Sequence, residues 1–278
     1  MPFAIRPLTP FLGAEILDFD PREECDAAKR AELVAALQEH RLLLFRAKPL
    51  NEEQQLRLTQ VAGVLTYRGY GNYTDLNQKS SLVSNAHKEG LFGDGELSFH
   101  SDLSFTPHIL KARSLHALIL PSYEDAGGET LFSDVQAAYD ELDPELKAKV
   151  EPLQARFAAT YDFGDRQETV DFVRPLIGTH PQTGRRFIAA SRAVTKEVIG
   201  MERPEFRALL KALWAHMEQP KYVYRHRWQL GDTLFWDNVA VQHARTPFDP
   251  KEKRALRAVS VDDPSIAITA KQRMTATA

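Results

Sequence analysis

The sequence predicts a mainly β fold, with a jelly-roll or β-sandwich core and helical insertions. Short apolar, β-branched or aromatic runs recur along much of the chain between turn signals such as HPQTG at 180–184, and this spacing is typical of all-β folds. Few segments have helical periodicity, and the sequence contains neither an internal repeat nor a glycine-rich phosphate loop. These observations disfavour a doubly wound parallel sheet.

The N-terminal part begins with helical signals. Residues 27–38 place apolar side chains on one helical face, and the apolar run 42–45 predicts a buried strand. Asn51 is expected to cap a second helix, because acidic residues follow it in the first turn and Gly63 lies near the expected end.

Two later segments are also predicted to be helical. The stretch 133–152 has the pattern of two short helices separated by a proline break, with Ser133 or Asp134 as the first cap. We expect this stretch to form a helical insertion between strands. A further helix is expected over 202–220.

Strand-like runs lie between and after these helices, at 112–120, 130–132, 155–163, 179–191, 223–229 and 232–235. The segment 66–95 differs from them, because it is rich in Gly, Asn, Ser and Tyr and has no clear period. We expect it to be a mobile surface segment that forms a lid or binding loop.

Composition limits the class of protein. The chain has 278 residues, 43% of them hydrophobic and 26% charged, with a formal net charge of −3. We expect one domain over 1–278 and no field that would attract nucleic acid or an anionic membrane. The single cysteine, Cys25, excludes an intrachain disulfide and a cysteine-rich metal site, which suits a reducing compartment. No secretory signal or long apolar span is visible, so a cytoplasmic protein is expected.

A metal-ligand pattern lies in the segment LSFHSDLSF. His100 and Asp102 are two residues apart, and in an extended strand residues i and i+2 point to the same face. A third ligand is available in His243, which follows the strand-like GDTLFW about 140 residues downstream. Two histidines and one carboxylate leave open positions on a metal, as in Fe(II) enzymes that bind an oxoacid and dioxygen.

A possible partner for such an oxoacid is Arg254, eleven residues after His243 in the run KEKRALRAVSV. A dicarboxylate that chelates the metal through one end needs a cation for its other carboxylate, and a guanidinium offers a planar, bidentate match. Thr130, in GGETLF, is a candidate for a second hydrogen bond to that carboxylate.

These stretches together resemble the taurine dioxygenase and chlorophenoxyacetate dioxygenase family (TauD/TfdA). The similarity runs over nearly the whole chain and is carried by LGAEI, FHSDLSF, GGETLFSDVQAAYDEL, YVYRHRWQLGDTLFWDN, QHARTPF and KRALR. The resemblance implies a double-stranded β-helix core and an Fe(II)- and 2-oxoglutarate-dependent oxygenase that uses O2 on a small-molecule substrate. It also implies that His100, Asp102 and His243 hold the metal and that Thr130 and Arg254 contact 2-oxoglutarate.

One departure from the family concerns the substrate. The taurine and chlorophenoxyacetate enzymes have a further arginine where this chain has Ala258. Arg257 is adjacent but is expected to point to the opposite side of a strand. The candidate substrate contacts are Phe163, Tyr70, Tyr73, Asn85 and Arg257.

Two alternatives remain open at this stage. A zinc-dependent hydrolase could use the same three ligands, although it gives Arg254 and Thr130 no role. A non-catalytic jelly-roll binding protein is the other. The sequence does not identify the substrate or the oligomeric state, so a homo-oligomer is open, and it does not decide among hydroxylation, desaturation, cyclisation and cleavage. A carboxylate at Asp102 leaves no place for a halide ligand, so hydroxylation is expected over halogenation.

Overall fold

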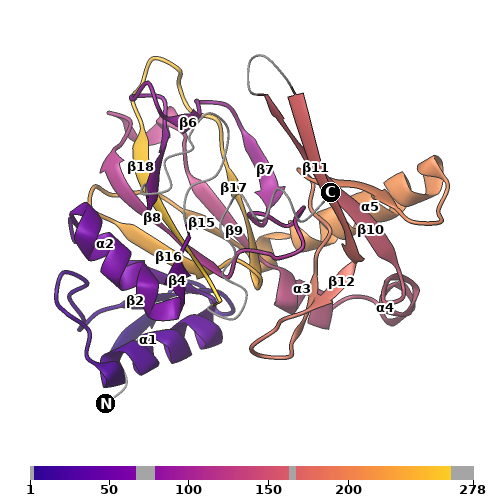
Figure 1. Cartoon of the computed structure of the whole chain (residues 1–278), viewed down its shortest axis with the longest axis horizontal. Coiled ribbons are helices and arrows are strands. Elements are labelled where there is room, and N and C mark those ends of the chain that lie inside the picture. Colours follow the sequence, from indigo (N-terminus) through magenta and orange to yellow (C-terminus); the bar gives the residue numbers. More distant parts are fainter. Residues whose placement is uncertain (1–2, 67–78, 163–166, 264–278) are drawn as a thin grey trace.

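A computed structural model gives the structure of residues 3–66, 79–162 and 167–263. Within these residues the chain is mainly β with several helices, as the sequence predicts (Figure 1). The strands are β1 (Ile5–Pro7), β2 (Ala14–Ile16), β3 (Leu42–Phe45), β4 (Val64–Leu65), β5 (Ser80–Ser84), β6 (Leu91–Phe92), β7 (Leu97–His100), β8 (Ala112–Ile119), β9 (Thr130–Asp134), β10 (Gln154–Asp162), β11 (Gln167–Pro175), β12 (Ile177–Thr179), β13 (Arg186–Ile188), β14 (Thr195–Val198), β15 (Val223–His226), β16 (Thr233–Asp237), β17 (Val241–Arg245) and β18 (Ala255–Asp262). The α-helices are α1 (Ala27–His40), α2 (Glu52–Thr59), α3 (Val135–Asp140), α4 (Pro144–Val150) and α5 (Arg203–Met217).

Two sheets share a core. The larger sheet has the order β1-β2-β3-β16-β8-β18-β5-β6, with β4 paired to β18, and the second has the order β15-β9-β17-β7. Their apolar side chains form one buried cluster, in which the rings of Phe132 on β9 and Trp236 on β16 lie 5.3 Å apart. The crevice between these sheets contains the candidate site.

The sequence of β3 is apolar throughout because both faces of this strand are buried. Leu42 and Leu44 belong to the core between the sheets, whereas Leu43 and Phe45 belong to the cluster that includes Leu33 of α1. A strand that is buried on both faces has no position for a polar side chain. In Figure 1, α1 and α2 lie together beside the larger sheet.

A further apolar cluster includes the helices that lie in sequence between β9 and β15 of the second sheet. Helices α3 and α5 pack there against β10, β13 and β14, and Figure 1 places this group at the opposite end of the molecule from α1. Strand β10 pairs with β11 and β14 in a separate sheet. The predicted pair of helices within 133–152 is confirmed as α3 and α4, between β9 and β10.

Local capping follows the sequence closely. Asn51 caps α2 through a reciprocal capping box with Gln54, and its polar side chain satisfies a backbone N–H that has no partner within the helix. Of the two candidates for the α3 cap, Asp134 is the residue used, and it accepts hydrogen bonds from the backbone of Gln136 and Ala137. Ser133 is not the cap, because its hydroxyl donates to the Met217 carbonyl at 2.7 Å.

Three expectations about strands need correction. Residues 80–84, placed in the irregular segment 66–95, form β5 and pair with β18, and their three serines conceal the alternation that predicts a strand. The run 179–191 is not one strand, because the HPQTG turn separates β12 from β13. Strand β11 (Gln167–Pro175) was not predicted, because its mixture of charged and apolar residues gives a weak strand signal.

None of the described helices combines the length and the apolar character needed to cross a bilayer.

Candidate metal centre and its pocket

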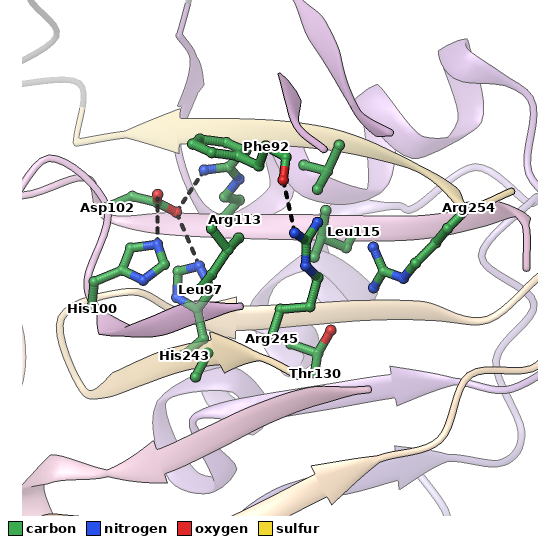
Figure 2. Close-up of a pocket in the computed structure, with 12 residues that line it drawn as sticks. Phe92, Leu97, His100, Asp102, Arg113, Leu115, Thr130, His243, Arg245 and Arg254 are labelled. Carbon is green, nitrogen blue, oxygen red and sulfur yellow. Dashed lines mark hydrogen bonds and ion pairs between the residues drawn. The ribbon is translucent and has the colours of Figure 1, made fainter. Parts of the chain in front are cut away.

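The three predicted metal ligands converge at one edge of the crevice (Figure 2). His100 on β7 and His243 on β17 are cross-strand neighbours, with ring centroids 4.3 Å apart. The Asp102 carboxylate lies 3.7 Å from Nε2 of His100 and 3.6 Å from Nε2 of His243. One ligand atom from each residue lies within 4.8 Å of the other two. Among the described residues, this is the group of His, Cys, Asp or Glu side chains whose geometry suits a metal ion.

The position of Asp102 corrects the strand argument in part. Strand β7 ends at His100, and Asp102 lies in the turn that follows, where Leu103 has a φ of 60°. The buried amide of Asn238 fixes this turn. It accepts a hydrogen bond from the Asp102 N–H at 3.0 Å and donates to the carbonyls of Asp102 and Leu110, each at 3.0 Å. A side chain 136 residues away in sequence therefore sets the direction of the carboxylate.

Both imidazoles are arranged to present Nε2 to a metal. Nδ1 of His100 lies 2.8 Å from the Ser98 carbonyl oxygen, which can only accept, so Nδ1 carries the proton and Nε2 is free to ligate. The His243 ring packs against Trp236, with centroids 5.0 Å apart. Burial, followed by the neighbouring charge of His100, lowers the pKa of His243 to about 3. The His243 ring is therefore neutral at physiological pH, which is its metal-binding form.

Arg113 on β8 is a contact that the sequence did not predict. Its Nη1 lies 2.6 Å from Oδ2 of Asp102 across the crevice. Burial alone would raise the pKa of Asp102, but the charge of Arg113, and then those of His243 and His100, outweigh burial and hold it below its usual range. The carboxylate is thus ionised before any metal binds.

A pocket extends from this centre towards Arg254. It is lined by Val83, Phe92, Leu97, His100, Asp102, Arg113, Leu115, Thr130, His243, Ala244, Arg245 and Arg254. Arg254 is only 1% exposed, and its Nε donates to the Gly128 carbonyl at 3.1 Å. Its Nη1 has no hydrogen-bond partner among the described residues. Burial, and then the charge of Arg245, lower the pKa of Arg254 to about 9.

Thr130 lines the same pocket at the start of β9. Its Oγ1 accepts a hydrogen bond from Nε1 of Trp228 at 3.0 Å. Because the indole N–H can only donate, the hydroxyl proton of Thr130 stays available for an acceptor in the pocket. Thr130 and Arg254, which the sequence analysis proposed as contacts of the oxoacid, therefore line the same pocket.

The candidate substrate contacts have different positions. Asn85 lies behind Arg254, where its Oδ1 accepts from the Arg254 backbone N–H at 2.9 Å, so it positions the start of β18. Arg257 does not line the pocket. Its Nε donates to Gln55 and its Nη2 to the Leu50 carbonyl, each at 2.7 Å. Phe163, Tyr70 and Tyr73 lie outside the described residues.

Sequence reasoning missed Arg113, Arg245 and Asn238. Arg245 had a usable signal, because it lies two residues after His243 on one strand and therefore shares its face. Arg113 and Asn238 had no such signal, because their partner Asp102 comes from a different part of the chain.

The role of the segment 66–95 as a lid remains a prediction. Residues 67–78 lie outside the described structure, whereas Val83 and Phe92 line the pocket.

Fold and site together define a candidate metal centre of two histidines and one carboxylate between two β-sheets, with a buried arginine at the far end of its pocket. The sequence model of the taurine catabolism dioxygenase TauD, TfdA family matches residues 4–260. The chain belongs to this family.

Known relatives extend over most of the chain. An alpha-ketoglutarate-dependent 2,4-dichlorophenoxyacetate dioxygenase of Cupriavidus pinatubonensis is 30% identical, with 95% of this chain and 99% of the relative covered. Pentalenolactone F synthase of Streptomyces arenae is 34% identical over 72% of this chain and 74% of its own. Among solved structures, AAD-2 in complex with Mn(II) and N-oxalylglycine has a TM-score of 0.80 and 28% identity, over 96% of this chain and all of that one.

Proposed function

We propose that the protein is an Fe(II)- and 2-oxoglutarate-dependent dioxygenase that oxidises an unactivated C–H bond of a small organic molecule, by hydroxylation, with release of succinate and CO2. The observation that carries this proposal is the buried Arg254 in the pocket of the three candidate metal ligands, whose Nη1 has no hydrogen-bond partner among the residues that the structure describes. A dicarboxylate bound to the metal by one end would place its other end where a cation can receive it.

The donor set fits the metal. Two imidazole nitrogens and one carboxylate on one side of an ion suit non-haem Fe(II) and leave positions for a chelating oxoacid and O2. His100, Asp102 and His243 would hold the iron, and Arg254 with Thr130 would bind the distal carboxylate of 2-oxoglutarate. Once bound, iron and 2-oxoglutarate supply the oxidising chemistry.

The chain contributes orientation and a water-poor pocket. Asn238 fixes the turn that carries Asp102, and the Ser98 carbonyl fixes the His100 ring. The aliphatic side chains of Leu97 and Leu115 form part of the wall between the metal centre and Arg254. A pocket of this kind strengthens the attraction between Arg254 and a carboxylate, because less water screens it.

The names of the relatives support this proposal over the alternatives. Several are alpha-ketoglutarate-dependent dioxygenases, and one solved relative contains Mn(II) and N-oxalylglycine. A zinc hydrolase would need the three ligands but not the buried Arg254. A non-catalytic binding protein would need none of the four residues in this arrangement. We also infer a double-stranded β-helix core for the two facing sheets and a single catalytic domain over 1–278.

Anaerobic difference absorption tests the proposal. Fe(II) and 2-oxoglutarate are added to the intact protein and to the His100→Ala and Arg254→Ala variants, with Arg257→Met as a control that removes a half-buried arginine outside the pocket. A visible charge-transfer band should form in the intact protein and the control, vanish in His100→Ala and weaken in Arg254→Ala. The absence of a band at any ligand concentration in the intact protein would refute the proposal.

A further inference from the structure

A second arginine faces the pocket beside Arg254. Arg245 lies on β17 and is only 4% exposed. In the pairing of β17 with β9, it lies directly opposite Thr130, and cross-strand partners project from the same face of a sheet. Arg245 and Thr130 therefore face the same space, and both line the pocket.

The guanidinium of Arg245 is only partly satisfied. Its Nε donates to the Gly95 carbonyl at 3.2 Å, and its Nη2 donates to the carbonyls of Phe92, at 2.8 Å, and of Gly95. Its Nη1 is buried and has no hydrogen-bond partner among the described residues. The side chain thus holds the segment 92–95 in place, and its Nη1 amino group still has no acceptor in the described part of the chain.

Arg245 and Arg254 lie close to each other. Their guanidinium carbons lie 5.4 and 5.9 Å from the centre of the same ring, that of Phe248. Figure 2 shows both side chains reaching into the part of the pocket next to Thr130. The pKa of Arg254 is lowered first by burial and then by the charge of Arg245, so the two guanidinium groups interact electrostatically.

Two buried cations in one pocket are unfavourable unless an anion joins them. Burial lowers the pKa of Arg245, and the charge of Asp94 opposes this effect, but neither arginine forms an ion pair with a carboxylate among the described residues. A ligand carboxylate fits this place. Its two oxygens have about four lone-pair sites, enough for two guanidinium groups and the Thr130 hydroxyl.

We propose that Arg245 is a second co-substrate arginine, which binds the distal carboxylate of 2-oxoglutarate together with Arg254 and Thr130. This inference rests on the proposed function. It has a structural consequence, because Nε and Nη2 of Arg245 hold the carbonyls of Phe92 and Gly95. A bound carboxylate that fixes the guanidinium also fixes the segment 92–95, from which Phe92 lines the pocket.

Calorimetric titration with N-oxalylglycine of the protein loaded with Mn(II) tests this role. The variants are Arg245→Gln, which keeps a donor but loses the charge, and Arg245→Lys, which keeps the charge. Loss of a charge-assisted hydrogen bond should weaken N-oxalylglycine binding in Arg245→Gln by about tenfold or more, and Arg245→Lys should weaken it less. Mn(II) affinity should stay within about threefold of the intact protein in both, because Arg245 is not a ligand of the metal.

Arg257→Met is the matched control. Arg257 is also a strand arginine that donates Nη2 to a backbone carbonyl, but it lies outside the pocket, so N-oxalylglycine affinity should not change. Should Arg245→Gln fail to fold, Arg245→Met replaces it, because its side chain can keep the packing on Phe248. Hydrogen exchange adds a readout that a purely structural role would not change. Amides of 92–97 should exchange more slowly after N-oxalylglycine binds to the intact protein, and this slowing should be lost in Arg245→Gln.

The outcomes separate the two proposals. Equal N-oxalylglycine affinity in Arg245→Gln and the intact protein would overturn the co-substrate role of Arg245 but not the proposed function. Arg245 would then have only the structural role of holding the segment 92–95. An intact protein that binds Mn(II) but neither N-oxalylglycine nor 2-oxoglutarate would overturn the proposed function, and this inference with it.

Discussion

Two buried polar regions of this chain are satisfied to different degrees. Around Asp232, which is fully buried, every charge has a partner. The carboxylate accepts from Nη1 of Arg46 at 2.7 Å, from Nε2 of His226 at 3.1 Å and from the backbone N–H groups of Ala47 and Gln229 at 2.8 and 2.9 Å. In the pocket, each of two buried arginines has an Nη1 without a partner among the described residues.

We interpret the difference as one between charges that stabilise the fold and charges that bind a ligand. Burying a charge without a partner is costly, and most buried polar groups are therefore paired. The cluster around Asp232 follows this rule within the chain, whereas Arg245 and Arg254 would satisfy it only when a carboxylate enters the pocket. The comparison predicts opposite responses to substitution in the two regions.

The largest expected effect on stability is at Asp232. Asp232→Ala leaves the charge of Arg46 and several buried donors without their acceptor, so the free energy of unfolding should fall by about 3 kcal/mol or more. Urea unfolding of the metal-free protein measures it. Asp232→Asn keeps one acceptor oxygen and should cost less. A loss below about 1 kcal/mol in Asp232→Ala would mean that this cluster does not stabilise the fold.

Asn238 connects the two kinds of region, because its own hydrogen bonds are satisfied and it also positions the candidate metal ligand Asp102. Asn238→Ala removes the partners of the Asp102 backbone and should lower the free energy of unfolding by about 1–3 kcal/mol. It should also weaken Mn(II) binding by roughly tenfold, since outer-shell partners of metal ligands have effects of this size. Normal Mn(II) affinity in a destabilised Asn238→Ala protein would limit Asn238 to a structural role.

Removal of a charge from the pocket should change the free energy of unfolding little, in contrast to Asp232→Ala. Arg254→Met removes a buried cation that has no carboxylate partner in the described ranges. The free energy of unfolding of the ligand-free variant should therefore lie within about 1 kcal/mol of that of the intact chain, in spite of the lost bond to Gly128. Thermal or urea unfolding without metal or oxoacid measures this. A loss of about 3 kcal/mol or more, as expected for Asp232→Ala, would show that Arg254 is a structural residue and would remove the distinction between the regions.

The last prediction concerns pH. Burial, and then the charge of Arg257, lower the pKa of His116 to about 4, and both ring nitrogens have partners in Leu50 and Thr233. Between about pH 6.5 and 4, the unfolded chain takes up a proton that the native ring refuses, so this contribution to stability is present above pH 6.5 and is lost as pH falls. His116→Gln should reduce the slope of stability against pH in this window by up to about 1.4 kcal/mol per pH unit.

Unfolding measured at several pH values checks this prediction. A slope in His116→Gln equal to that of the intact protein would mean that the native ring takes up the proton after all. The residue differs from His243, whose Nδ1 has no partner among the described residues, so the two buried histidines repeat the contrast between satisfied and unsatisfied groups.

Sequence predicted best what neighbouring residues determine. The all-apolar run of β3, the cap at Asn51 and the spacing of His100 and Asp102 each depend on a few consecutive positions, and all three recur in the structure. His243 was proposed as the third ligand because it follows the strand-like GDTLFW, and the resemblance to a family supported this choice, since no local pattern links it to Asp102.

What sequence could not predict depends on contacts between distant strands. Arg113 forms an ion pair with Asp102 because β8 and the turn after β7 face each other across the crevice. The sequence around a single arginine in a strand does not indicate which carboxylate it will pair with. Strand β5 was concealed by its serines, because its pairing with β18 is made by the backbone. The missing hydrogen-bond partner of Arg245 Nη1 can be recognised only in the structure, where the burial of this atom and the acceptors around it are both known.

The most direct test of the central claim compares 2-oxoglutarate with 2-oxopentanoate, an oxoacid of the same chain length without the distal carboxylate. Both are titrated anaerobically into the Mn(II)-loaded intact protein and the Arg254→Met variant. The intact protein should prefer 2-oxoglutarate by about a hundredfold, and the variant should lose most of this preference while it still binds both oxoacids weakly. Equal affinities for the two oxoacids in the intact protein would contradict the claim that the buried arginines await a carboxylate.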